Sequence, residues 1–333
     1  MRIGDHDTGS QALDRIIAIR PGALGDALLL FPTLALLRRA FPSTSITLVA
    51  RPDVLPLAHA SSLANATSSY DDPRWSAVFS DSPNEDSSAR DLLAGTTTLA
   101  WLVDSWSSVA RNLETLGARQ AFTLPPLPLA DSPEHIALHL SRALTLLGVE
   151  APSSITALGA AMPPLAPPDE DERRARDVWK QLGLADSSTS VVAIHPGSGG
   201  AAKRWPPERF AELASSIRQM EYIPLLLEGP QDVEVADIVV ERARGTVRRT
   251  RDLSIGSLAT LLQRCKAYVG NDSGVTHLAG MLGIRTLALF GPTDPARWAP
   301  LGPYVQIIRA EDGRMESLSA PEVAVALASL LQD

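Results

Sequence analysis

An acidic residue stands alone at the point where a glycine-containing turn meets a long apolar run. Asp26 follows Gly25, and Gly22 lies in the same turn. A carboxylate at such a junction could act as a general base that removes a proton from an attacking hydroxyl. It could also accept backbone N–H groups at the start of a helix, where the positive end of the helix dipole favours acids. The local sequence leaves both roles open.

Two cations and a serine lie in a glycine-rich segment, HPGSGGAAKRWPPERF. Lys203 and Arg204, together with Ser198, suit an anionic phosphate, and ordinary solvated surface cations are the alternative. The glycines match a loose dinucleotide-binding fingerprint, but Pro206 and Pro207 delay the helix that this motif requires at its glycines. The residues around the lysine also depart from a phosphate-binding P-loop. The segment therefore predicts a phosphate-facing loop that follows neither motif.

A third polar group lies in the segment VGNDSGVTHLAG. Asp272 follows an apolar stretch, and Ser273 and Gly274 open a predicted helix. The exposed N–H groups and the dipole at a helix start form an anion site, and small residues allow close approach of a ligand. The structural alternatives are that Asp272 or Ser273 caps the helix and that His277 packs in the core. The composition of the loop favours ligand binding.

The turn FGPTDPARW places Asp294 between two prolines, where its side chain can bond its own backbone. We expect this turn to lie beside the preceding loop, and we count Asp294, with Gly22 and Gly25, among the candidate residues of a cleft. Neighbouring acids at residues 71–72 and 169–171 could suggest a metal site. Solvated acids or a helix start explain both groups, so no metal site is predicted.

Composition limits the classes of protein that the chain can represent. Its 333 residues, 45% of them hydrophobic, are enough for two folded domains, and a formal net charge of −8 argues against a nucleic-acid partner. Cys265 is the single cysteine, which excludes a disulfide framework and favours the cytoplasm. Residues 1–14 are polar and do not form a signal peptide, and the apolar run at residues 27–37 is too short to span a bilayer.

The elements that must position these residues alternate between strand and helix. This alternation predicts an α/β fold with parallel sheets covered by helices on both faces, and ligands of such sheets bind beyond the carboxyl ends of the strands. Each polar group above follows the end of a predicted strand. Strands are expected at residues 15–19, 45–50, 99–104, 190–195, 222–228, 266–270 and 286–290, and helices at residues 134–147, 173–182, 207–220, 232–244, 257–264 and 275–282.

The proline-rich stretch AAMPPLAPPDEDE divides the chain into two such units. We expect a flexible N-terminus at residues 1–14, an N-terminal domain at residues 15–160, a linker at residues 161–172 and a C-terminal domain at residues 173–333. The prediction leaves open whether the last helix stays with the C-terminal domain or packs back on the N-terminal domain. Two parallel-sheet domains joined in this way leave a cleft between them.

Taken in order, the motifs resemble the heptosyltransferases of glycosyltransferase family 9. The set consists of GALGD before an apolar helix, HPGSG with KRWP, EGP after a strand, GNDSGVTHLAG, and LFGPTDPARW. The resemblance implies the GT-B architecture of two facing Rossmann-like domains. It also implies inverting transfer of a sugar, typically heptose from ADP-heptose, to the core of lipopolysaccharide without a required metal or other cofactor.

Carried over by position, the resemblance makes Asp26 the general base and Lys203 the contact to the donor phosphates. It assigns donor binding to the helix start at Asp272, Ser273, Gly274, Val275 and His277, with Ser198 and Arg204 in the loop near Lys203. Near the donor ribose it leaves Glu228, Gln231 and Asp232 as open candidates. The residues before Asp26 and residues 65–98 depart from the family pattern, so the acceptor is not identified.

Partners implied by this reading are a nucleoside-diphosphate sugar and a glycan or lipid-linked acceptor, with at most peripheral contact at the inner face of the membrane. The rival functions are a nucleotide-sugar 2-epimerase of the same architecture and a non-catalytic nucleotide-sugar binding protein. An epimerase needs further acids and a histidine around the sugar ring. The retained Asp26 argues against a binding protein without turnover.

The first prediction concerns metal dependence. Because Lys203 and backbone N–H groups are expected to meet the charge of the diphosphate, transfer activity should persist in excess EDTA. The measurement is the release of nucleoside diphosphate before and after chelation. Complete loss of activity that magnesium or manganese restores would contradict this expectation.

Overall fold

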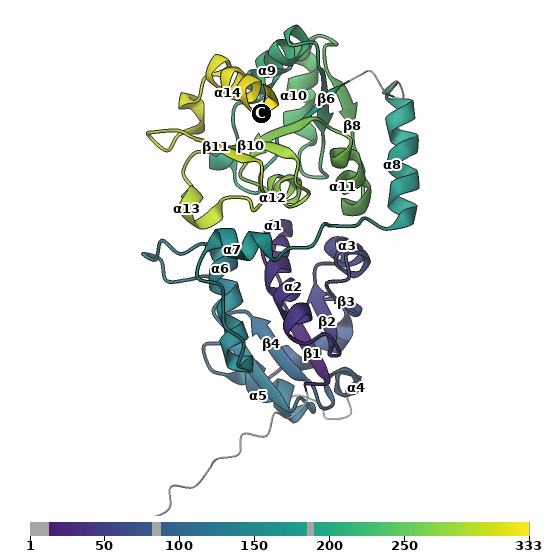
Figure 1. Ribbon diagram of the computed structural model, residues 1–333, viewed down its shortest axis with the longest axis vertical. Helices are drawn as coiled ribbons and strands as arrows, with labels where there is room; N and C mark the ends of the chain where they lie inside the picture. Colours follow the sequence, from purple (N-terminus) through teal and green to yellow (C-terminus); the bar gives the residue numbers. More distant parts are fainter. Residues whose placement is uncertain (1–12, 82–87, 185–189, 333) are drawn as a thin grey trace, which may run out of the picture.

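The computed structural model describes residues 13–81, 88–184 and 190–332. Two parallel sheets form the centres of two units, as Figure 1 shows. The N-terminal sheet has the order β3-β2-β1-β4-β5, and the C-terminal sheet has the order β11-β10-β9-β6-β7-β8. This arrangement confirms the predicted fold class. The expected flexible segment at residues 1–14 lies, up to residue 12, outside the described residues.

The strands of the N-terminal sheet are buried at its centre and partly exposed at its edges. β1 lies between β2 and β4, and its apolar sequence RIIAI suits a strand covered on both faces. The strands are β1 (Arg15–Ile19), β2 (Ser45–Ala50), β3 (Ala66–Ser69), β4 (Thr97–Trp101) and β5 (Gln120–Leu124). Around them lie α1 (Leu24–Leu28), α2 (Phe31–Ala40), α3 (Leu55–Ala60), α4 (Ala89–Leu93), α5 (Ser108–Thr115), α6 (Ile136–Ser141) and α7 (Ile155–Ala160), with 3₁₀ turns η1 (Pro52–Val54), η2 (Pro73–Phe79) and η3 (Arg142–Leu147).

The C-terminal sheet repeats this plan with one more strand. Its strands are β6 (Val191–His195), β7 (Ile223–Leu227), β8 (Arg248–Thr250), β9 (Ala267–Asn271), β10 (Arg285–Phe290) and β11 (Val305–Arg309). Its helices are α8 (Asp169–Gln181), α9 (Pro207–Gln219), α10 (Val233–Ala243), α11 (Ile255–Gln263), α12 (Gly274–Met281), α13 (Pro295–Trp298) and α14 (Ala320–Gln332), with η4 (Ala201–Lys203) and η5 (Met315–Ser317). β6 and β9 are adjacent central strands, so the loops that follow them lie together.

The apolar run at residues 27–37 is divided between two helices. α1 ends at Leu28 and α2 begins at Phe31, with Pro32 in its first turn, where the missing N–H has no cost. Within the described ranges, no helix is both long enough and apolar enough to cross a membrane.

The two units meet where the first turns of α1 and α12 touch, between the two sheets in Figure 1. A Cβ placed on Gly274 would lie 2.7 Å from the Cβ of Leu24, and one on Gly25 would lie 3.2 Å from Cδ2 of His277. Glycine at both positions therefore permits the close approach of the two helices. This contact brings the segment after β1 next to the segment after β9.

Three expectations from the sequence need correction. α8 begins at Asp169, so the acids of the expected linker form the first turn of a helix, where the dipole favours them. The helix expected at residues 134–147 is shorter, and its second half is the 3₁₀ turn η3. The last helix, α14, packs against α9 and β10 of the C-terminal unit instead of returning to the N-terminal one.

Cys265 provides a test of packing in the C-terminal unit. It is buried after α11, and burial raises the pKa of its thiol far above the usual range. The native protein should therefore not react with a thiol-specific disulfide reagent near neutral pH, because the thiolate is the reactive form. The same reagent should titrate the thiol after unfolding in guanidinium chloride. Fast reaction of the native protein would contradict the buried position.

Candidate functional site

Asp26 is held by two donors at the carboxyl end of β1. Its Oδ1 accepts a hydrogen bond from Nη2 of Arg20 at 3.0 Å, and its Oδ2 accepts one from the N–H of Ala23 at 2.9 Å. Asp26 is the third residue of α1 and not its N-cap, although its bond to Ala23 closes the helix start. A quarter of the Asp26 side chain remains exposed, with 26% of its surface accessible. Asp26 therefore closes the start of α1 and still has a carboxylate that is accessible to solvent.

Gly22 leaves room for the Asp26 carboxylate against the turn. Its φ of +132° belongs to the region that favours glycine, and a Cβ there would lie 2.8 Å from Oδ2 of Asp26. A side chain at this position would collide with the carboxylate or rotate it. The glycine predicted as a cleft residue thus acts on the orientation of Asp26.

In the C-terminal unit, Lys203 and Asp272 form an ion pair that the sequence analysis did not anticipate. Nζ of Lys203 lies 2.8 Å from Oδ2 of Asp272, and the Thr293 hydroxyl donates to the same oxygen at 2.8 Å. Lys203 also lies 5.8 Å from the ring centroid of Trp298. Asp272 is therefore not a cap. It holds the lysine at the carboxyl edge of the sheet, where the lysine stays one-third exposed.

Thr293 and Trp298 escaped the sequence analysis. Both follow β10, Thr293 in the loop and Trp298 at the end of α13, and the signal for them is that β10 neighbours β9, so the segments after these strands share an edge of the sheet. The predicted turn residue Asp294 accepts the Ala296 N–H at 3.1 Å and caps α13. The expected neighbourhood of the two loops is thus confirmed by the bond between Thr293 and Asp272.

The start of α12 is capped by Ser273, whose Oγ accepts the N–H of Thr276 at 3.4 Å. Gly274 and Val275 are the first two residues of the helix, and both are half-buried. Their N–H groups belong to the first turn, which lacks acceptors within the helix. This end of α12 lies beside the pair of Lys203 and Asp272, so the helix start and the lysine ammonium belong to the same edge of the sheet.

Hydrogen bonds attach the glycine-rich loop to the end of β9. The Asn271 side chain accepts the Trp205 N–H at 3.0 Å and donates to the Pro196 carbonyl at 2.8 Å. Ser198 donates to the Asp272 carbonyl at 2.8 Å, and Nε of Arg204 donates to the Ser198 carbonyl at 3.0 Å. Ser198 and Arg204 therefore order the loop that carries Lys203.

His277 lies at the contact between the two units and is almost fully buried, at 3% exposure. Burial lowers its pKa to about 4, against the opposing effect of Asp272 and Asp26, while His135 and Lys203 lower it further. Its imidazole is consequently neutral near neutral pH. Among the described residues, its Nδ1 has no hydrogen-bond partner.

The three candidates for ribose contact have different surroundings. Glu228 is buried in an ion pair with Arg249, and Gln231 is exposed at the surface. Asp232 lies 3.1 Å from Nε2 of His195 and accepts the Gly229 N–H at 3.2 Å. Burial raises the pKa of Asp232, but these hydrogen bonds outweigh burial and bring it below its usual value. Of the three side chains, only that of Gln231 is exposed.

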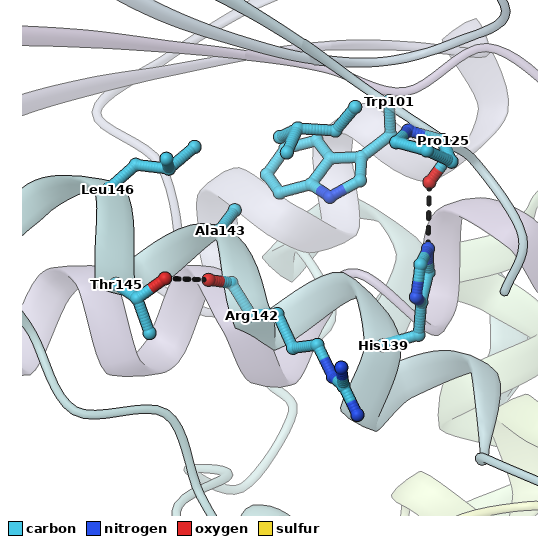
Figure 2. Close-up of a pocket in the computed structure, with 8 residues that line it drawn as sticks. Trp101, Pro125, His139, Arg142, Ala143, Thr145 and Leu146 are labelled. Atoms are coloured by element: carbon cyan, nitrogen blue, oxygen red, sulfur yellow. Dashed lines mark hydrogen bonds between the residues drawn. The ribbon is translucent and has the colours of Figure 1, made fainter.

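A cavity of about 200 Å³ opens elsewhere, in the N-terminal unit at the ends of β4 and β5. Figure 2 shows Trp101 and Pro125 on one side and His139, Arg142 and Leu146 on the other, with His139 bonded to the Pro125 carbonyl. None of the predicted site residues lines it. Within the described residues, no group of three or more His, Cys, Asp or Glu side chains is arranged to hold a metal ion.

The two parallel-sheet units, which meet at the segments after β1 and β9, have the GT-B fold. Residues 133–326, more than half of the chain, match the model of glycosyltransferase family 9 (heptosyltransferase). The chain belongs to this family, as the ordered motifs predicted.

Individual relatives agree with the family match. The chain is 30% identical to lipopolysaccharide heptosyltransferase 2 of Escherichia coli K12 over 155 residues, which are 41% of this chain and 44% of that protein. The match thus spans less than half of this curated relative. A family 9 glycosyltransferase of Veillonella parvula has a TM-score of 0.81 at 22% identity, over 97% of this chain and 99% of the other. E. coli heptosyltransferase WaaC, solved with ADP, has a TM-score of 0.71 at 17% identity, over 95% and 99%.

Lys203 provides the test of the phosphate-facing loop. Lys203→Ala should weaken the binding of ADP by roughly 1.5–3 kcal/mol, the range for a hydrogen bond to a charged group. Isothermal calorimetry gives the dissociation constant.

Lys266→Ala is the matched control, because Lys266 is an exposed lysine that precedes β9 at the opposite edge of the same sheet. Its dissociation constant should equal that of the wild type. Unchanged ADP binding in Lys203→Ala would identify Lys203 as an ordinary surface cation.

Proposed function

We propose that the protein transfers a sugar from a nucleoside-diphosphate sugar to an acceptor hydroxyl, with inversion at the anomeric carbon. Heptose from ADP-heptose is the proposed donor group, and the core of lipopolysaccharide or a related glycoconjugate is the proposed acceptor. Family membership supports this reaction class. The observation that carries the proposal is the approach of the Asp26 segment to the start of α12, beside Lys203.

The donor diphosphate is proposed to bind at the start of α12. Charge develops on the diphosphate as its bond to the sugar breaks, and preorganised positive groups lower the barrier to that step. The Lys203 ammonium and the N–H groups at Gly274 and Val275 supply such a potential. Asp272 keeps the ammonium in place, and no metal ion is assigned to the reaction.

The acceptor hydroxyl is proposed to approach from the N-terminal unit. Its oxygen attacks the anomeric carbon from the face opposite the diphosphate, so the new glycosidic bond forms as the old C–O bond breaks. The electron pair of the broken bond leaves with the diphosphate, and Asp26 takes the hydroxyl proton. A single displacement of this kind inverts the anomeric configuration.

A lipid-linked acceptor places the proposed reaction at the cytoplasmic face of the inner membrane, with peripheral contact only. The identity of the donor can be tested first by thermal melting with ADP- and UDP-sugars. A ligand at 100 times its dissociation constant adds about 2.7 kcal/mol to the free energy of unfolding. Stabilisation by UDP-sugars alone would contradict the proposed ADP-heptose donor.

Asp26→Asn tests the proposed chemistry. The amide cannot accept the proton, so the rate of transfer should fall by about 10²–10⁴, the usual contribution of a general base. ADP affinity should stay unchanged, since the donor is assigned to the other unit. The melting temperature should fall, because the buried Arg20 loses its charge partner.

Asp53→Asn is the matched control. Asp53 forms an ion pair with Arg51 at 2.5 Å in the same unit, and both side chains are about one-third exposed. This variant should transfer the sugar at the wild-type rate. A near-normal rate in Asp26→Asn would remove Asp26 from the reaction and leave it as a residue that closes the start of α1.

A further inference from the structure

Arg20, which follows β1 directly, is a buried cation that the sequence analysis did not select. Its side chain is only 4% exposed. Nη2 donates to Oδ1 of Asp26 at 3.0 Å, and Nη1 donates to the Trp101 carbonyl at the end of β4 at 3.4 Å. The guanidinium therefore bridges the carboxyl ends of two adjacent strands and the proposed base.

The stability of the fold gives little reason for an arginine here. Burial lowers the pKa of Arg20, and the charge of Asp26 only partly opposes this effect. Among the described residues, Nε of Arg20 has no hydrogen-bond partner. A buried ion pair seldom stabilises a fold more than apolar packing does, and an unpaired buried donor has its own cost. The residue type therefore calls for another explanation.

The geometry supplies that explanation, because the two oxygens of Asp26 have separate donors. Arg20 holds Oδ1 and the Ala23 N–H holds Oδ2, while Gly22 leaves room for the carboxylate against the turn. Two donors on different oxygens fix the rotation of the carboxylate plane. Each oxygen can accept a second hydrogen bond, so acceptor capacity remains for a hydroxyl.

A guanidinium suits this task because it does not exchange its proton near neutral pH. The other ionisable groups near Asp26 cannot replace it. His277 approaches from α12 as a neutral imidazole, His135 contacts the Ala299 carbonyl, and the Lys203 ammonium is paired with Asp272. Arg20 is the charged donor that contacts the carboxylate.

We propose that Arg20 is a positioning residue, which orients the Asp26 carboxylate toward the acceptor hydroxyl. This inference rests on the proposed function. It predicts that Arg20 acts through Asp26 and has no direct contact with the donor. Loss of the guanidinium should then affect the chemical step and leave nucleotide binding intact.

A double-mutant cycle tests the inference with Arg20→Ala, Asp26→Asn and the combined variant. Arg20→Ala alone should lower kcat by about 10²-fold, the usual effect of a misplaced reactive group, with the KM of the donor and the Kd of ADP unchanged. In the Asp26→Asn background, the same substitution should lower kcat less than about twofold, because residues that act as a unit are not additive. Arg20→Lys should recover part of the lost rate.

Arg15→Ala is the matched control, since Arg15 begins the same strand at its opposite end. Its guanidinium donates to the carbonyls of Leu92 and Ala94 at 2.9 and 3.0 Å. This variant should lower the melting temperature without lowering kcat. If Arg20→Ala does not fold, Arg20→Lys takes its place in the cycle.

Additive losses in the cycle, or a rise in the Kd of ADP, would overturn the positioning role. A different result marks failure of the proposed function. If Asp26→Asn retains its rate, Asp26 is not the base, whatever Arg20→Ala does. Collapse in Asp26→Asn with a normal rate in Arg20→Ala would reject only the inference about Arg20.

Discussion

The close approach of α1 and α12 is the constraint on which the rest of the molecule depends. Gly25 and Gly274 bring the two helix starts so near that a methyl group at Gly274 would overlap Leu24. The loops after β1 and β9 are thereby placed next to each other, although they belong to different sheets. A site that contains both Asp26 and Lys203 needs both units, because neither unit alone contains the two residues.

Each side of this contact has its own means of ordering a charged group. In the N-terminal unit, Arg20 and the Ala23 N–H fix the carboxylate of Asp26. In the C-terminal unit, Asp272 fixes the ammonium of Lys203 with help from Thr293. Both arrangements place a partly exposed charged group on a buried counterion, so the group is oriented and still accessible. Preorganisation of this kind reduces the reorganisation that a reaction would otherwise require.

His277 of α12 lies against Gly25 of α1 at this contact. Its burial lowers its pKa and so removes a charge that would otherwise compete for Asp26. Asn271, the last residue of β9, holds the Lys203 loop through hydrogen bonds with the Trp205 N–H and the Pro196 carbonyl. Buried Asn271 therefore orders a loop, whereas Asp26 and Lys203 stay partly exposed.

Local sequence determined most of the fold. The strands at β1, β6 and β9 and the helix starts at Pro207 and Ser273 follow from apolar runs, proline placement and capping, which act over a few residues. The ordered motifs also indicated the family. The edge strands β3, β5, β8 and β11 were missed, because they are short or partly exposed and lack a continuous buried run.

Only the tertiary structure decided which charged groups meet. The pairing of Lys203 with Asp272 joins residues 69 positions apart, and that of Glu228 with Arg249 buries one of the three open candidates for ribose contact. The bond between Arg20 and Asp26 spans six positions, but it depends on the positive φ of Gly22 and on the neighbouring end of β4. Local patterns specify where the chain becomes a helix or a strand. Ion pairs depend on distances of a few ångströms between side chains, and these are set only when the sheets and their loops are packed together.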